Sequence, residues 1–211
     1  MNGKTFSIGE AISYGWNVVK GNFFFFLLVI IVVAILNGIP MGLEAALQQD
    51  SPGLSFLINI ASTIITMVIS MGVIKIALNF VDQQSAEFSD LFSCFHLIIK
   101  YFFANLIYFI IVFIGLIFFI IPGLIFIYMF FFFTYIIVDK EAGPISALKE
   151  SAVITKGVKS KLLTFSFVLF GLNILGALCF LIGLLVTIPI SLIASAYVYR
   201  TLERQTGMAL T

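Results

Sequence analysis

Charged and metal-binding residues are scarce in this sequence. Only 10% of its 211 residues are Asp, Glu, Lys or Arg, and histidine occurs once, as His96. A protein metal site needs several His, Cys, Asp or Glu side chains to converge, and no such cluster surrounds His96 in the sequence. Cys94 lies in a polar, helix-like stretch and Cys179 in an apolar one. We therefore expect neither a metal centre nor a structural disulfide.

Signatures of catalysis are also missing. No glycine-rich phosphate loop follows a strand, and no acid, base and nucleophile come together along the chain. The apolar stretches hold no paired acids of the kind that carry protons through a membrane, which argues against a proton-coupled transporter. We expect no enzymatic activity, no cofactor and no nucleic-acid partner.

Apolar residues make up most of the chain. They account for 62% of the sequence and include 25 Phe, far above the average of soluble proteins. This composition is typical of an integral membrane protein. We expect one all-α membrane domain over residues 1–211, because this length leaves no room for a separate soluble enzyme domain.

Apolar runs of the sequence predict six transmembrane helices. One membrane crossing needs about 20 mainly apolar residues, so the first two runs supply one helix each and the last two supply two each. The first run is too long for the core of a signal peptide, and a retained helix is expected. The predicted turn in the third run is Pro122 with Gly123; in the fourth run Gly183 fits the helix lengths better than the alternative, Pro189. The runs are residues 23–43, 54–80, 101–138 and 162–199.

Positive charge falls on one side of this predicted topology. The opposite loops carry only Glu44 and Asp50 as formal charges, so the positive-inside rule places both termini in the cytoplasm. Lys75 lies inside a predicted helix near its cytoplasmic end; we interpret it as reaching the interface, with an ion pathway as the alternative. The basic residues are Lys4, Lys20, Lys75, Lys100, Lys140, Lys149, Lys156, Lys159, Lys161, Arg200 and Arg204.

An amphipathic stretch precedes each predicted hairpin of two membrane helices. The sequence therefore predicts three approximate repeats, residues 5–81, 86–138 and 143–202. Apolar residues in each stretch recur at helical spacing, and we expect these stretches to lie along the cytoplasmic face as interfacial helices. The apolar positions are Ile8, Ile12, Trp16 and Val19; Phe88, Leu91, Phe92 and Phe95; and Ile145, Leu148 and Ala152.

Two asparagines occupy matching places in the first and third repeats. Superimposing Lys20 on Lys156 aligns Asn37 with Asn173. An amide in hydrocarbon commonly finds its partner on a neighbouring helix. We interpret both asparagines as interhelical polar contacts, with substrate binding as the alternative.

Three lysines gather just before the fifth predicted helix. Lys156, Lys159 and Lys161 are candidates for contact with lipid headgroups, since each basic residue near an anionic membrane surface contributes about 1 kcal/mol. Ordinary positive-inside bias explains the same cluster.

Four segments carry a family resemblance: "EFSDLFSCF", "IIPGLIFIYMFFFFTYIIVDK", "ALKESAVITKG" and "YVYRTL". With them, the chain resembles a broad group of uncharacterised bacterial integral membrane proteins. That group is similar to the membrane domain fused to some glycerophosphoryl diester phosphodiesterases. The resemblance implies a multi-pass protein of the bacterial plasma or inner membrane. It implies no established activity, and no catalytic residues carry over from the soluble phosphodiesterase domain.

These observations favour a membrane-organising or accessory protein that contacts membrane lipids or a membrane-protein partner. The alternative is a transporter or exporter of a lipid-like or amphipathic small molecule or peptide, because internal repeats are common in transporters. An enzyme acting on membrane lipids ranks last, since no catalytic arrangement is visible.

Overall fold

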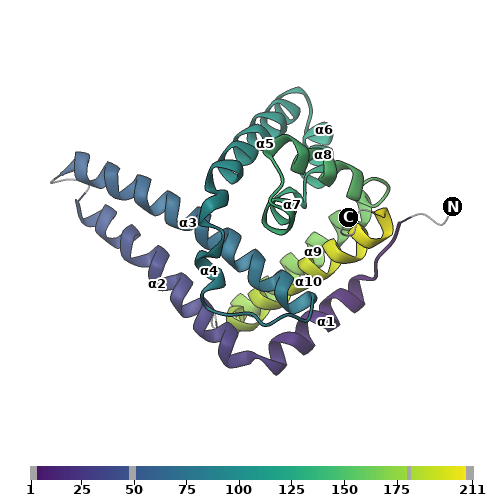
Figure 1. Ribbon diagram of the computed structural model, residues 1–211, viewed down its shortest axis with the longest axis horizontal. Coiled ribbons are helices and arrows are strands. Elements are labelled where there is room, and N and C mark those ends of the chain that lie inside the picture. The colour runs from purple at the N-terminus through teal and green to yellow at the C-terminus, as the bar shows by residue number, and fades with distance from the viewer. Residues whose placement is uncertain (1–3, 48–50, 180–181, 208–211) are drawn as a thin grey trace.

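The computed structural model describes residues 4–47, 51–179 and 182–207, which form helices and contain no strand (Figure 1). In chain order the helices are α1 (Ile8–Gly21), α2 (Phe23–Leu47), α3 (Pro52–Val81), α4 (Asp90–Ser93), the 3-10 helix η1 (Phe95–Leu97), α5 (Ile98–Phe118), α6 (Ile120–Met129), α7 (Phe133–Lys140), α8 (Pro144–Ile154), α9 (Lys159–Leu178) and α10 (Leu184–Thr206).

Six segments of the described chain are long and apolar enough to cross a membrane. This confirms the prediction of a helical protein with six apolar helices, and the multi-pass membrane class that follows from it. The segments are Phe23–Leu47, Pro52–Val81, Asp90–Phe118, Ile121–Lys140, Lys159–Leu178 and Leu184–Thr206.

The turn inside the third uncharged run lies earlier than predicted. Phe119 leaves helical geometry, with φ −165° and ψ 148°, between α5 and α6. Pro122 falls in the first turn of α6, where its missing N–H costs no hydrogen bond. The prediction of a turn at Pro122 and Gly123 is therefore wrong by a few residues. In the fourth run, Gly183 directly precedes α10.

Helices adjacent in sequence pack against one another. Helix α2 lies along α3, α5 along α6, and α9 along α10, while α1 covers α10 (Figure 1). The α2–α3 pair projects from the rest of the molecule, and only the second half of α3 enters the core. Helix α1 approaches α10 closely at Gly15, where an added Cβ would stand 2.7 Å from the Ile190 carbonyl oxygen.

The fourth apolar segment is broken between α6 and α7, and α8 supplies the hydrogen bonds that the break leaves open. Ser151 Oγ donates to the Met129 carbonyl at 3.1 Å and accepts from the Phe132 N–H at 3.1 Å. Thr155 Oγ1 donates to the same carbonyl at 2.9 Å. Both hydroxyl residues are fully buried. Free backbone groups at membrane depth are tolerated only when such partners exist.

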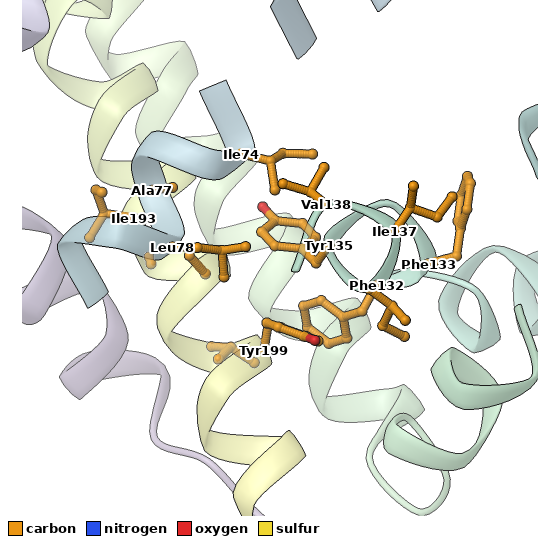
Figure 2. Packing of buried hydrophobic residues seen from close by; sticks show 14 of the residues in the cluster. Ile74, Ala77, Leu78, Phe132, Phe133, Tyr135, Ile137, Val138, Ile193 and Tyr199 are labelled. Carbon is orange, nitrogen blue, oxygen red and sulfur yellow. The ribbon is translucent and has the colours of Figure 1, made fainter. Parts of the chain in front are cut away.

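The core lies where α3, α7 and α10 meet. Figure 2 shows the rings of Phe132, Tyr135 and Tyr199 packed together, with centroid separations of 5.6 to 5.7 Å. Leu78 and Ile193 extend this apolar cluster from α3 and α10. Helices α3, α7 and α10 therefore form one packing unit.

Each of the three amphipathic stretches divides its apolar residues between the protein interior and the surface. Val19, Leu91 and Leu148 are buried, whereas Trp16 and Ile145 are exposed. In the second stretch, helical structure is interrupted at Cys94, between α4 and η1. The apolar pattern thus serves internal packing as well as the surface.

Candidate functional site

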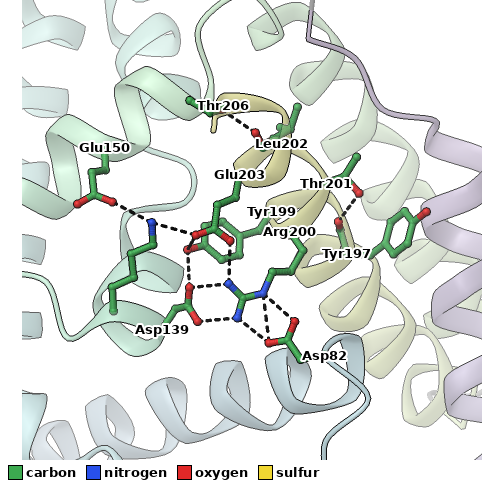
Figure 3. Close-up of polar contacts among 11 residues, drawn as sticks. Asp82, Asp139, Glu150, Tyr197, Tyr199, Arg200, Thr201, Leu202, Glu203 and Thr206 are labelled. Atoms are coloured by element: carbon green, nitrogen blue, oxygen red, sulfur yellow. Dashed lines mark hydrogen bonds and ion pairs between the residues drawn. The ribbon is translucent and has the colours of Figure 1, made fainter. Parts of the chain in front are cut away.

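Three helix ends bring charged residues together beside the aromatic core (Figure 3). Asp82 directly follows α3, Asp139 lies in the last turn of α7, and Arg200 lies in the C-terminal part of α10. Glu203 follows Arg200 by almost one helical turn, so both side chains point to the same side of α10. We call Arg200, Asp82, Asp139, Glu203 and Lys140 the Arg200 cluster.

Arg200 uses all five of its N–H donors, the full number that a guanidinium offers. Nε donates to Asp82 Oδ1 at 2.9 Å, and Nη2 donates to Asp82 Oδ2 at 2.6 Å. Asp139 accepts from Nη1 and Nη2, both at 2.6 Å. The remaining Nη1 donor binds Glu203 Oε2 at 2.7 Å. Paired contacts of this kind fix orientation as well as distance.

Lys140 and Tyr199 complete the surroundings of the carboxylates. Lys140 Nζ lies 2.9 Å from Glu203 Oε1 and 3.4 Å from Glu150 Oε2. The Tyr199 hydroxyl donates to Asp139 Oδ2 at 2.9 Å. Each carboxylate of the Arg200 cluster therefore has a cationic or hydroxyl partner.

The Arg200 cluster is largely withdrawn from solvent. The Arg200 side chain is 11% exposed, that of Asp139 10% and that of Glu203 2%. Buried charges are costly unless they are paired and hydrogen-bonded. Here the pairing is complete for Arg200, so the cluster can hold three helix ends in a defined arrangement.

A polar cavity of about 670 Å³ adjoins the Arg200 cluster. Tyr14 of α1 forms part of its wall, stacked on Tyr197 at a centroid distance of 4.8 Å, and donates to the Phe80 carbonyl at 3.2 Å. Burial, with smaller contributions from Tyr197 and Asp82, raises the pKa of Tyr14 above its ordinary value. The lining residues are Tyr14, Lys75, Leu78, Asn79, Val81, Asp82, Gln83, Gln84, Asp139, Tyr197, Arg200, Thr201, Glu203 and Arg204.

The two asparagines singled out from the sequence each bond to the next helix. Asn37 Oδ1 of α2 accepts from Thr66 Oγ1 of α3 at 2.7 Å. Asn173 Nδ2 of α9 donates to Ser191 Oγ of α10 at 2.9 Å. Neither residue lines the cavity beside the Arg200 cluster.

The three lysines singled out from the sequence lie around the start of α9, with the N-terminal segment beside them. Lys161 Nζ donates to Thr5 Oγ1 at 2.7 Å and lies 5.3 Å from the centroid of the Phe6 ring. Lys156 is exposed and Lys159 half-buried. Lys4 lies close enough to Lys156 for the positive charge of Lys156, together with burial as the larger cause, to lower the pKa of Lys4. We call Lys4, Lys156, Lys159 and Lys161 the lysine patch.

No group of three or more His, Cys, Asp or Glu that could hold a metal occurs among residues 4–47, 51–179 and 182–207. His96 Nε2 instead lies 3.1 Å from Glu141 Oε1, at an exposed position. Cys94 and Cys179 are both free thiols.

Sequence reasoning missed the Arg200 cluster, although a signal was present. In three places a long apolar stretch closes with an apolar residue followed by a charge: Val81 before Asp82, Val138 before Asp139, and Tyr199 before Arg200. Aligning these ends places two acids and one base at equivalent positions.

Comparisons with protein-family models, with curated proteins and with solved structures found no match to this chain.

Proposed function

We propose that this multi-pass protein is a membrane-organising or accessory protein that contacts lipids or a membrane-protein partner and catalyses no reaction. The saturation of the Arg200 cluster carries this proposal. Arg200 has no donor left for a substrate, because Asp82, Asp139 and Glu203 accept all of them. A fully satisfied buried network rigidifies the structure around it, and a rigid frame is what a scaffold requires.

We further propose the membrane arrangement that the charge pattern favours. The chain forms three hairpins, each preceded by a cytoplasmic amphipathic segment, with both termini in the cytoplasm of a bacterial cell. The charges of the Arg200 cluster support this arrangement, since Asp82, Asp139 and Arg200 all lie at the ends assigned to the cytoplasm. The quoted sequence segments support a relationship to the bacterial membrane-protein group named above.

The lysine patch supplies the proposed lipid contact. Lys156 and Lys159 have no hydrogen bond or ion pair within the described chain, so both ammonium groups remain available to anionic headgroups. The exposed rings of Trp16, Phe92 and Phe95 suit the boundary between headgroups and acyl chains. Lys161 contributes less, since its ammonium is already bound to Thr5.

A transporter or exporter of an amphipathic molecule is the second candidate. The 670 Å³ polar cavity supports it, as does the helix break between α6 and α7, because transporters commonly place interrupted helices beside their binding sites. This candidate requires Arg200 to exchange its carboxylate partners as the helices move.

Reconstitution into vesicles distinguishes the scaffold from the transporter. We expect the purified protein to move no fluorescent phospholipid between leaflets beyond the rate in protein-free vesicles, and to retain anionic lipid through purification. Replacing Lys156, Lys159 and Lys161 together by Gln should reduce that retention, whereas Lys149→Gln, at an exposed position of α8, should not. Lipid movement that disappears in Arg200→Gln would contradict the scaffold proposal and favour the transporter.

A further inference from the structure

Two basic side chains in the cavity beside the Arg200 cluster lack an acidic partner. Lys75 and Arg204 both line this cavity, yet neither has a hydrogen bond or ion pair with any described residue. The acids of the same wall, Asp82, Asp139 and Glu203, are all bound to Arg200. Unpaired positive charge is therefore confined to these two residues of the lining.

Lys75 and Arg204 come from different helices and from different depths. Lys75 lies seven positions before Asp82 in α3, or about 10 Å along the helix axis at 1.5 Å per residue. It is half-buried, whereas Arg204 is exposed in the last turn of α10. A charged residue within a membrane-spanning segment is costly and marks a functional site by default. Reaching the interface, our first interpretation of Lys75, leaves its place in this cavity unexplained.

The unpaired charge of the lining favours an anion as the occupant. The lining holds as many carboxylates as cations, so its formal charges balance: Asp82, Asp139 and Glu203 against Lys75, Arg200 and Arg204. Because all three carboxylates are bound to Arg200, the positive charges of Lys75 and Arg204 have no bound acid in the lining. The carboxylate oxygens of the wall already accept hydrogen bonds. The side chains of the lining that donate no hydrogen bond are those of Lys75 and Arg204, the amides of Gln83 and Gln84, and the hydroxyl of Tyr197.

We propose that this cavity binds a phosphate monoester group, with Lys75 and Arg204 as its cationic contacts. Such a group carries close to two negative charges at neutral pH and offers three acceptor oxygens. A guanidinium fork and an ammonium point charge suit that geometry. The volume of about 670 Å³ lies within the range of small-molecule sites and leaves room for whatever the phosphate is attached to.

The stacked pair of Tyr14 and Tyr197 forms an aromatic part of the same wall, so an attached organic group would have a surface to pack on. Free phosphate and a lipid with a phosphate-monoester headgroup share the proposed chemistry. A scaffold does not require this site, so the proposal stands independently of the proposed function.

Titration of the purified full-length chain tests the site. Inorganic phosphate and short-chain phosphatidic acid are added separately at constant ionic strength, and binding is followed by calorimetry. Lys75→Gln and Arg204→Gln should each weaken binding about tenfold or more, the loss expected for one charge-assisted hydrogen bond. Lys20→Gln is the matched control, because Lys20 is exposed and lies outside the cavity.

Saturable binding of either ligand, weakened by both variants and not by the control, supports the proposal, and the ligand that binds identifies the source of the phosphate. Absence of saturable binding by the folded wild type would overturn it. Equal affinities of Arg204→Gln and Lys20→Gln would also overturn the proposal. This comparison remains decisive if Lys75→Gln fails to fold, because Arg204 and Lys20 are both exposed.

Discussion

At the scale of single residues, the largely buried charge of Arg200 is fully paired with carboxylates. Its five donors bind five oxygen atoms of Asp82, Asp139 and Glu203. Removing one partner of a buried ion pair is far more costly than the pair's net contribution, since a charge is left uncompensated. Single substitutions in the Arg200 cluster should therefore be strongly destabilising.

Asp139→Asn tests that expectation. The substitution removes a charge that accepts two hydrogen bonds from Arg200 and one from Tyr199, so the free energy of unfolding should fall by about 3 kcal/mol. Glu150→Gln is the control, because Glu150 is 29% exposed and makes one long contact of 3.4 Å with Lys140. The free energy of unfolding of Glu150→Gln should fall by less than about 1 kcal/mol. Thermal unfolding in detergent measures both, and equal losses would argue against a special role for Asp139.

Ser151 of α8 stabilises the break between α6 and α7 by binding backbone groups there. Ser151→Ala leaves the Phe132 N–H at the break between α6 and α7 without its hydroxyl partner. An unsatisfied buried donor costs about 1–3 kcal/mol, and the melting temperature should fall accordingly. Ser146→Ala, at an exposed position of the same helix, should leave the melting temperature almost unchanged. If both variants melt alike, Ser151 does not stabilise the break.

At the scale of elements, α8 and α1 connect parts of the chain that are distant in sequence. Helix α8 closes the gap between α6 and α7 through Ser151 and Thr155. Helix α1 covers α10, and the backbone of Thr5, just before α1, exchanges two hydrogen bonds with the Gln205 side chain. Both helices therefore belong to the folded core as much as to the surface.

Gly15→Ala tests how closely α1 packs on α10. An added methyl group would meet the Ile190 carbonyl oxygen at 2.7 Å, so α1 must move away, at a cost of about 1–3 kcal/mol. Gly9→Ala in the same helix meets no atom within 4 Å. It should stabilise α1 by up to about 1 kcal/mol, because Ala is the better helix former. Unfolding curves that shift in the same direction for both variants would contradict this packing.

At the scale of the whole molecule, the proposed membrane topology rests on the distribution of charge along the chain. Cysteines placed at Ser51 and at Gln84, in a variant without Cys94 and Cys179, should react with a membrane-impermeant thiol reagent from opposite sides. Gln84 should react only from the cytoplasm, since it lies in a connection flanked by basic residues. Reaction of the cysteine at position 51 from the cytoplasmic side would contradict the proposed topology.

The helices could be predicted from the sequence, because a chain in hydrocarbon must satisfy its backbone hydrogen bonds internally. Long uncharged runs such as residues 162–199 then have few alternatives. The break at Phe130–Phe132 could not be predicted, since no Gly or Pro marks it and its partners come from α8.

The sequence shows Asp82, Asp139 and Arg200 each directly after an apolar stretch, but their mutual pairing could not be predicted. Asp82 and Asp139 lie 118 and 61 positions from Arg200, and each charge alone fits the end of an apolar stretch. Only the packing of α3, α7 and α10 shows that these charges pair.

A double-mutant cycle on Arg200 and Asp139 tests the central claim, that the Arg200 cluster holds the three helix ends together. The apparent free energies of unfolding of Arg200→Gln, Asp139→Asn and the double variant are compared with that of the wild type. We expect a coupling energy of about 1–3 kcal/mol, because residues of one ion-pair network are not independent. Additive losses, with a coupling energy near zero, would contradict the claim and leave the two residues as separate contributors to stability.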